Sequence, residues 1–280
     1  MSRVAVATCA VNDIDPDSPV LLAALDRAGV EARLCAWDDP AVAWGDYDLV
    51  VVRSTWDYPE RRGDFLRWAR GLARVENPYP VLEYSSDKHY LADLASRGVR
   101  VVASTFVEVG EATTWPVGDF VVKPSVGAGS RDAERYRPDQ VELAAAHVAR
   151  LHALGRDALV QPYVHSVDEV GERALVFIDG SFSHALTKGA MLNVVADDRD
   201  ALFRRERMTL CTPEPEALAF AAAALDAVQW TELLYARVDL VRDDWGWALM
   251  ELELVEPSLF LVHHPPAAVS LAQGIARRAA

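Results

Sequence analysis

Cysteine and lysine are both scarce in this chain of 280 residues, where each occurs only three times. The cysteines, Cys9, Cys35 and Cys211, are widely spaced and form no Cys-x-x-Cys pair. Isolated cysteines in an odd number argue against a disulfide framework and against a structural zinc site. We therefore expect three plain thiols in a cytoplasmic protein. The N-terminal run Val4-Ala5-Val6-Ala7 fits a first β-strand better than a signal peptide.

A long apolar run and an excess of basic charge are missing as well. The longest mostly apolar stretch, Leu218 to Val228, is too short to span a bilayer and contains Asp226. Lysine and arginine total 28 against 42 aspartates and glutamates, so the net charge is −14. Nucleic acids and anionic membranes both require a basic surface. The sequence therefore predicts a protein that binds neither.

The first 80 residues alternate between strand and helix patterns. Strands are predicted at 4–8, 30–37 and 49–52, and helices at 19–27 and 59–73. Ser18 is the expected N-cap of the first helix. This order predicts a parallel sheet with right-handed crossovers. A Gly-x-Gly-x-x-Gly fingerprint for dinucleotides does not follow the first strand.

The pattern changes twice after the breaker cluster Asn77-Pro78-Tyr79-Pro80. A helix at 87–96 leads into strands, a glycine-rich loop and a helix that end near residue 161. From residue 171 hairpins follow, the first around the turn Asp179-Gly180. We therefore predict an α/β fold, with an N-terminal parallel α/β domain ahead of two α+β subdomains. The predicted ranges are 1–84, 85–165 and 166–280.

A strand that ends in lysine and runs into a glycine loop is the first candidate site. Lys123 closes the strand Phe120-Val121-Val122 and precedes the loop Gly127-Ala128-Gly129-Ser130. Such a loop can present backbone N–H groups to phosphate oxygens while the lysine supplies a point charge. A plain hairpin loop is the alternative. The strand end at Gln161, Tyr163 and Val164 is a weaker candidate for contact with an adenine edge.

Three carboxylates form the second candidate site. Glu251 and Glu253 are two residues apart on a predicted strand and therefore point to one face. Asp239 lies on the strand expected to pair with it, across a turn at 243–246. Like charges repel at this distance unless a cation lies between them, and Mg²⁺ fits carboxylate and phosphate oxygens. The alternative is a solvated strand face with arginine partners.

Several other polar residues end predicted strands. Arg53, Ser54 and Thr55 follow a buried strand, at the end where ligands gather in open α/β sheets, although they could also cap the next helix. Trp56 and Tyr58 are expected to be packing residues. Lys188 ends a hairpin strand and is a candidate phosphate or adenine contact. Arg173 lies on the paired strand, with a strand-edge salt bridge as its alternative role.

In chain order these candidates resemble the motifs of the ATP-grasp ligase superfamily, over nearly the whole sequence. Four further segments are similar to its small, glutathione-synthetase-like ligases, typified by the O-ureido-serine cyclo-ligase of cycloserine biosynthesis. They are Val51–Tyr58, Phe182–Lys188, Tyr235–Asp239 and Glu251–Leu261. The resemblance implies an N-terminal α/β domain followed by the two-part ATP-grasp fold.

The resemblance also implies a role for each candidate. Lys88, Lys123 and Lys188 would contact the nucleotide phosphates. Gly127, Ala128, Gly129 and Ser130 would cover the phosphates, and Gln161, Tyr163 and Val164 would face adenine. Asp239, Glu251 and Glu253 would hold Mg²⁺, with Mn²⁺ as an alternative. Arg53, Ser54 and Thr55 would contact the substrate, and the catalytic set would be Lys123, Arg173 and Lys188.

The implied activity is ATP-dependent ligation. The γ-phosphate would pass to a carboxylate of a small amino-acid-like substrate, and an amine or an internal nitrogen would then displace phosphate. The expected partners are the small-molecule acid and amine, with a homodimer as an open option. Two departures from the family pattern stand out. Glu253 replaces a common asparagine, and Gly189-Ala190-Met191-Leu192-Asn193-Val194 replaces a Gly-Asp-Phe-Arg-x-Gln-like stretch.

The second departure removes the arginine that faces the transferring phosphoryl group in related ligases. The nearest arginines in this chain are Arg199, Arg204, Arg205 and Arg207. A nucleotide-binding homologue without ligase turnover is therefore the alternative function.

Overall fold

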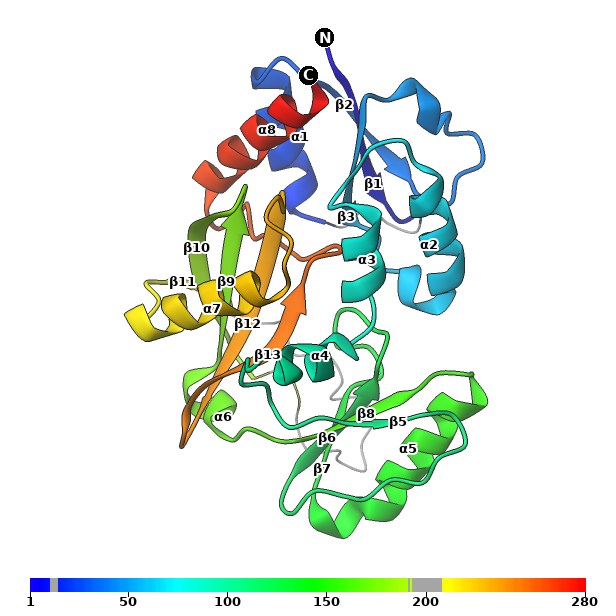
Figure 1. Ribbon diagram of the computed structural model, residues 1–280, viewed down its shortest axis with the longest axis vertical. Helices are drawn as coiled ribbons and strands as arrows, with labels where there is room; N and C mark the ends of the chain where they lie inside the picture. Colours follow the sequence, from blue (N-terminus) through cyan, green and yellow to red (C-terminus); the bar gives the residue numbers. More distant parts are fainter. Residues whose placement is uncertain (11–14, 191, 193–207) are drawn as a thin grey trace.

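The computed structural model describes residues 1–10, 15–190, 192 and 208–280 (Figure 1). Its first sheet is parallel, with strand order β2-β1-β3-β4. The strands are β1 (Arg3–Thr8), β2 (Glu31–Ala36), β3 (Leu49–Ser54) and β4 (Val75–Glu76). The accompanying helices are α1 (Asp17–Arg27), α2 (Arg62–Gly71) and α3 (Tyr79–Ser85). The predicted parallel α/β fold at the N-terminus is confirmed.

The start of α1 differs from the prediction. The helix begins at Asp17, so Ser18 lies inside it and the predicted N-cap is wrong. The Asp15 carboxylate accepts a hydrogen bond of 3.0 Å from the Asp17 amide and thereby satisfies a donor at the helix start. Pro19 still lies in the first turn, where its missing N–H costs no helix hydrogen bond.

Two antiparallel sheets follow the parallel one. The second sheet has the order β5-β8-β6-β7 and is covered by α5 (Val141–Ala153). Its strands are β5 (Thr105–Val107), β6 (Phe120–Pro124), β7 (Glu134–Tyr136) and β8 (Ala158–Pro162). The third sheet has the order β11-β10-β9-β12-β13. Its strands are β9 (Glu172–Ile178), β10 (Ser181–Lys188), β11 (Met208–Cys211), β12 (Tyr235–Asp243) and β13 (Gly246–Glu253).

The remaining helices are α4 (Tyr90–Ser96), α6 (Ser166–Val170), α7 (Pro215–Ala227) and α8 (Pro265–Ala279). Two of them pack against sheets that lie far away in the sequence. The C-terminal helix α8 lies beside α1 and shares a hydrophobic core with the first sheet and with β9 and β12 (Figure 1). Helix α4 packs into the core of the third sheet. No helix in the described ranges is long and apolar enough to cross a membrane.

Hairpin geometry fixes the register of the third sheet. Asp179 and Gly180 have positive φ values of 52° and 75° and join β9 to β10, as the Asp-Gly dipeptide predicts. Strands β12 and β13 pair so that Asp239 lies opposite Glu251 and Arg237 lies opposite Glu253. The expectation that Asp239 lies on the strand paired with the two glutamates is therefore confirmed.

A buried asparagine ties the first sheet to the third. The Asn77 side-chain amide donates hydrogen bonds to the carbonyls of Tyr235 and Leu254, at 2.9 and 2.8 Å. Its oxygen accepts a hydrogen bond of 2.9 Å from the Leu234 amide. All its hydrogen bonds therefore hold the ends of β12 and β13 against the chain that leaves β4. The predicted breaker cluster at 77–80 is in this way a junction between sheets.

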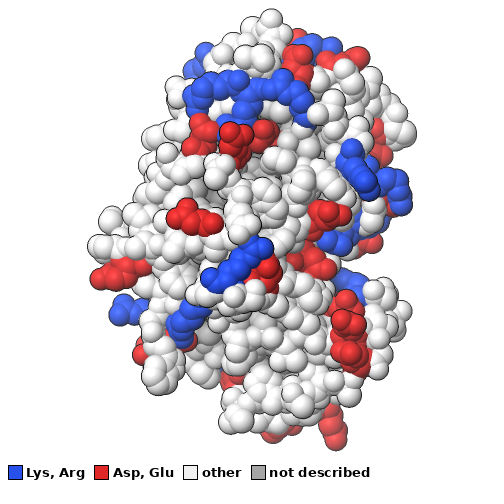
Figure 2. All heavy atoms as spheres, in the orientation of Figure 1, with Lys and Arg blue, Asp and Glu red and all other residues white. Residues whose placement is uncertain are grey.

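The charge excess is not gathered into one acidic area on the face shown in Figure 2, where acidic and basic groups lie next to each other. Arg277 and Arg278 on α8, for example, both pair with Asp179 at the β9–β10 turn. Such pairs join the C-terminal helix to the third sheet, although exposed ones add little stability individually.

Candidate active site

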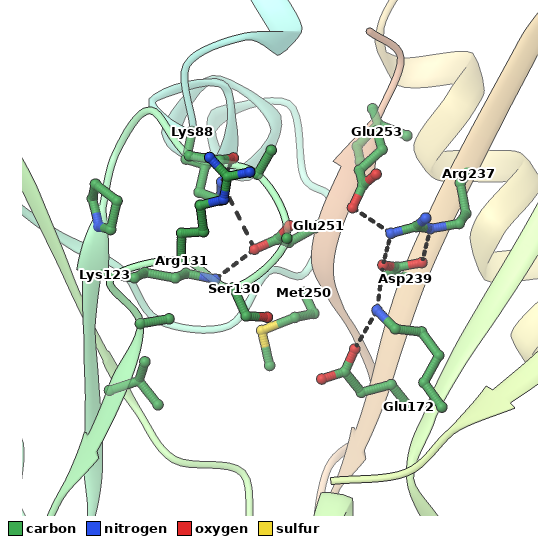
Figure 3. Close-up of a pocket in the computed structure, with 18 of the residues that line it drawn as sticks. Lys88, Lys123, Ser130, Arg131, Glu172, Arg237, Asp239, Met250, Glu251 and Glu253 are labelled. Carbon is green, nitrogen blue, oxygen red and sulfur yellow. Dashed lines mark hydrogen bonds and ion pairs between the residues drawn. The ribbon is translucent and has the colours of Figure 1, made fainter. Parts of the chain in front are cut away.

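A cavity of about 350 Å³ opens between the second and third sheets. It is bounded on one side by Lys88, Lys123, Ser130 and Arg131, and on the other by the third sheet, from which the Glu251 side chain reaches toward the two lysines (Figure 3). Most of the predicted site residues line it: Lys88, Lys123, Gly127, Ala128, Gly129, Ser130, Gln161, Tyr163, Val164, Lys188, Asp239, Glu251 and Glu253. The fold therefore brings together residues that lie up to 165 positions apart in the sequence.

Two lysines converge on Glu251. The Lys123 ammonium at the end of β6 lies 2.6 Å from a Glu251 oxygen, and the Lys88 ammonium lies 3.9 Å from the same oxygen. Lys88 also donates a hydrogen bond of 3.0 Å to the Gly127 carbonyl and thereby anchors the glycine loop. Burial alone would raise the pKa of Glu251, but Lys123 and Lys88 outweigh it and hold this pKa well below its ordinary value.

A second group of charges surrounds Asp239. Arg237 lies on the same face of β12 and donates to both Asp239 oxygens, at 2.9 and 3.0 Å. Lys188 lies 3.0 Å from Asp239 and 3.2 Å from Glu172. Burial would raise the pKa of Asp239, but Arg237 and Lys188 lower it below its ordinary value. Asp239 is therefore held as a buried carboxylate between two cations.

Glu253 completes the row of acids. Its carboxylate pairs with Arg237, which is shared with Asp239 (Figure 3). Burial is the largest influence and raises the pKa of Glu253 to about 6, because Arg237 only partly offsets it and the other two acids add repulsion. The three carboxylates are thus each paired with a lysine or arginine side chain. Of the alternative, a solvated strand face with arginine partners, the arginine partner is present as Arg237, but the face is not solvated, because Asp239 is buried.

A close backbone approach positions Lys188. Gly171 has a φ of 69°, and a Cβ added there would lie 2.3 Å from the Lys188 carbonyl oxygen. Only glycine lets the chain between α6 and β9 pass so near the end of β10. This contact helps hold the lysine where its ammonium reaches Asp239.

The segment predicted to face adenine, at Gln161, Tyr163 and Val164, is held by contacts within the protein. The Tyr163 amide donates a hydrogen bond of 2.8 Å to the Asp119 carbonyl, and the Arg135 guanidinium lies 3.6 Å from the centre of the Tyr163 ring. Gln161 donates to Ser104 at 2.9 Å. Because the Tyr163 amide is used within the protein, it does not remain for an adenine edge.

Four predicted site residues do not line this cavity. Arg53 is 2% exposed, with its guanidinium 5.4 Å from the centre of the Tyr235 ring, and the Ser54 hydroxyl donates to Thr8 at 2.9 Å. Thr55 is fully buried. Arg173 donates to the Val170 carbonyl at 2.8 Å and lies 3.3 Å from Glu214, which matches its alternative role in a salt bridge.

The described residues include only part of the stretch that departs from the family pattern. Leu192 lines the cavity. The other positions of interest, Met191, Asn193 and Val194 and the arginines Arg199, Arg204, Arg205 and Arg207, lie outside the described residues.

Sequence reasoning missed several residues of the cavity wall. Arg237 and Glu172 carry a detectable signal, because each lies close in sequence to a residue that was singled out, Asp239 and Arg173. Trp56 and Tyr58 line the cavity, although they were expected only to pack. Other missed lining residues include Ser85, Tyr90, Arg131, Met250, Glu256, Ser258 and Phe260.

The acids provide hard oxygen donors of the kind that Mg²⁺ prefers. In the part of the chain that is described, however, no group of three or more acid, histidine or cysteine side chains is close enough to hold a metal ion by itself. Magnesium sites commonly use one or two carboxylates and take their other ligands from phosphates and water. The donor set therefore fits an ion that arrives with a phosphate-bearing ligand.

Comparisons with known proteins agree along the whole chain. The family described as D-cycloserine synthetase DcsG, N-terminal domain, matches residues 4–78. The cycloserine biosynthesis protein DcsG of Streptomyces lavendulae is 40% identical over 302 aligned residues, 99% of each chain. The crystal structure of D-cycloserine synthetase DcsG has a TM-score of 0.89 and 37% identity, with complete coverage of both chains. A Bacillus anthracis D-alanine–D-alanine ligase complexed with ATP shares the fold, with a TM-score of 0.72, 15% identity and coverage of 100% and 97%.

Proposed function

The chain is an ATP-grasp ligase, an enzyme that forms carbon–nitrogen bonds, and belongs to the family of D-cycloserine synthetase DcsG. On that premise we propose that it uses Mg²⁺ and ATP to activate the carboxylate of a small amino-acid-like substrate as an acyl phosphate. A nitrogen atom then displaces the phosphate. The single observation that carries this proposal is the cavity in which three lysines and three carboxylates face one another.

The nucleotide would lie along the second sheet. Lys88, Lys123 and Lys188 supply point charges for its phosphates, and the backbone N–H groups of Gly127–Ser130 cover them. The adenine would lie against the chain after β8, at Gln161, Tyr163 and Val164, where apolar and aromatic groups line the cavity. Because the Tyr163 amide already donates to Asp119, the Tyr163 carbonyl and the Val164 amide are the groups assigned to the adenine edge.

Asp239, Glu251 and Glu253 would hold Mg²⁺ together with the phosphate oxygens. The bound ion supplies positive charge that balances the triphosphate and the acids. Each acid is now paired with lysine or arginine, so binding exchanges partners: the lysines pass to phosphate and the acids to metal. Neither set of charges is left unpaired in the cavity, which avoids the large cost of a buried single charge.

Arg237 is the described arginine best placed to face the substrate carboxylate. It lies beside Asp239 and Glu253, and it donates a hydrogen bond of 3.1 Å to the Ser258 carbonyl, which fixes its orientation. A carboxylate oxygen attacks the γ-phosphorus, the bond to the β–γ bridging oxygen breaks, and ADP leaves. The nitrogen then attacks the acyl carbon, the carbon–oxygen bond breaks, and inorganic phosphate and a proton are released. Positioning and charge stabilisation carry such a reaction.

Release of ADP that depends on a carboxylic acid tests the proposal. The panel includes both enantiomers of O-ureidoserine, serine and alanine, each with Mg²⁺ and ATP. The family names of the relatives point to cycloserine formation, so we expect O-ureidoserine to give the highest rate. If no acid raises ADP release above the background hydrolysis of ATP, the chain binds nucleotide without ligase turnover, which is the function that the altered stretch after Lys188 favours.

A further inference from the structure

One acid in the cavity lacks a cationic partner. Five acids line the cavity in the described ranges, and four of them, Glu172, Asp239, Glu251 and Glu253, have a lysine or arginine nitrogen within 4.0 Å. The fifth, Glu256, has no such neighbour among the described residues although it is only 9% exposed. A buried carboxylate without a counter-charge is costly. Burial and the nearby Glu253 raise the pKa of Glu256 to about 8, because the more distant charges of Lys88 and Arg237 offset them only in part.

Two aromatic side chains from the segment after β3 lie in the same part of the cavity. Trp56 and Tyr58 line the same cavity, and the Trp56 indole N–H donates a hydrogen bond of 3.3 Å to the Glu256 carbonyl. Burial raises the pKa of the Tyr58 hydroxyl well above its ordinary value, and the charge of Glu256 is the second influence that raises it. An organic ammonium group fits beside a single carboxylate and aromatic side chains, whereas Mg²⁺ needs several oxygen ligands and keeps water. The surroundings of Glu256 therefore favour an amine over a metal ion.

The position of Glu256 relates it to the reacting end of the substrate. It follows Glu253 by three residues, a separation that spans at most about 10 Å of extended chain. Arg237 connects the two places, because it pairs with Glu253 and donates to the carbonyl of Ser258, two residues after Glu256. A small molecule can therefore place a carboxylate near Arg237 and a second group at Glu256.

We propose that Glu256 binds the ammonium group of the amino-acid substrate, and that this contact selects an amino acid over the same acid without its amine. The inference deepens the proposed function and rests on it. The carboxylate and the ammonium form a charge-assisted hydrogen bond in a cavity walled by Trp56 and Tyr58, where such bonds are strong.

The test compares two probes that differ only in the amine: O-ureidoserine and 3-(ureidooxy)propanoic acid. The variants are Glu256→Gln, which keeps the shape and removes the charge, and Glu256→Asp, which restores the charge. Glu142→Gln, on the exposed surface of α5, is the matched control. We expect the wild-type protein to prefer the amino probe at least tenfold in kcat/KM. Glu256→Gln should raise the KM of the amino probe at least tenfold, leave the KM of ATP within twofold, and abolish the preference.

Each other result overturns the inference. An equal loss with both probes means that Glu256 only supports the fold, and a changed Mg²⁺ requirement means that it is a metal ligand. Failure of Glu256→Asp to recover any preference argues against a charge contact. If the wild type releases no ADP with any acid, the proposed function fails separately. Calorimetric binding of both probes, with Mg²⁺ and a non-hydrolysable ATP analogue, then decides the role of Glu256, and equal or absent binding of the amino probe contradicts it.

Discussion

Lys123 and Glu251 are 128 positions apart in the sequence, and their charged groups meet at 2.6 Å across the cavity. Lys123 comes from β6 of the second sheet and Glu251 from β13 of the third. The pair thus connects the two sheets at the place where we expect the nucleotide phosphates. A lysine at this point serves the free protein as a partner for Glu251 and the complex as a partner for phosphate.

Glu251→Gln should destabilise the protein in the absence of ligands. Lys123 and Lys88 are mostly buried and would lose their shared carboxylate, so we expect a loss on the order of 3 kcal/mol in the free energy of unfolding. Urea denaturation at pH 7 measures it, with Glu142→Gln as a control that should change little. An unchanged midpoint would show that the pair contributes nothing.

The stability difference between wild type and Glu251→Gln should depend on pH in the acid range. The pKa of Glu251 is lowered in the folded protein, so its contribution to stability is present above the unfolded value near 4.5 and is lost as the pH falls through the folded value. The difference in unfolding free energy between wild type and Glu251→Gln should therefore shrink steadily below about pH 4.5. A difference that is constant from pH 7 to pH 3 would argue against a carboxylate held by the lysines.

Gly171→Ala should cost more than Gly155→Ala, although both glycines have a φ of 69°. An alanine at a left-handed φ costs about 1–2 kcal/mol. At Gly171 the cost is higher still, because its ψ of −176° belongs to a region that is essentially open to glycine alone. At Gly171 the new methyl group would also meet the Lys188 carbonyl at 2.3 Å, whereas at Gly155 nothing lies within 4 Å. We expect an additional loss of about 2 kcal/mol for Gly171→Ala, together with weaker ATP binding. Equal effects of the two variants would remove the role assigned to the close approach.

Glu256→Gln should stabilise the free protein at alkaline pH. Because the pKa of Glu256 is raised to about 8, the folded state holds a proton that the unfolded state releases near 4.5. This acid therefore lowers stability as the pH rises from about 4.5 to about 8, and the cost stays constant above that range. The melting temperature of the variant should match wild type at pH 4 and exceed it at pH 8.5. If the melting temperatures of wild type and variant depend on pH in the same way, the pKa of Glu256 is not raised in the folded protein.

Mg²⁺ should increase the stabilisation that ATP provides. A ligand at 100 times its Kd stabilises the folded state by about 2.7 kcal/mol, and balanced charges in the cavity should lower the Kd. We expect a larger melting-temperature shift with Mg²⁺ and ATP than with ATP and a chelator. Glu251→Gln, compared with its own ligand-free melting temperature, should lose most of the metal-dependent part. Equal shifts with and without Mg²⁺ would place the metal elsewhere.

The local parts of this site could be predicted from the sequence because they follow short-range rules. Alternation along a strand places Glu251 and Glu253 on one face, and the turn at 243–246 sets Asp239 opposite Glu251. The lysine followed by a glycine loop is equally local. These features depend on spacing alone and do not require knowledge of how the sheets pack.

The remaining parts depend on contacts between distant segments. Nothing in the local pattern shows that Trp56 reaches the carbonyl of Glu256, 200 positions away, or that α8 returns to α1. Arg53 ends its strand as a ligand-binding residue would, yet it packs against Tyr235 of the third sheet. The choice between lining a cavity and filling a core is made by tertiary packing, which hydrophobic periodicity does not encode.

Transfer of oxygen from substrate to phosphate tests the central claim most directly. O-ureidoserine labelled with ¹⁸O in its carboxylate is incubated with the protein, Mg²⁺ and ATP, and the released inorganic phosphate is analysed by mass spectrometry. An acyl phosphate that is displaced by nitrogen leaves one carboxylate oxygen on the phosphate, so we predict one ¹⁸O atom per phosphate and none in the nucleotide. Unlabelled phosphate released together with ligated product, or ¹⁸O in AMP, would contradict the account.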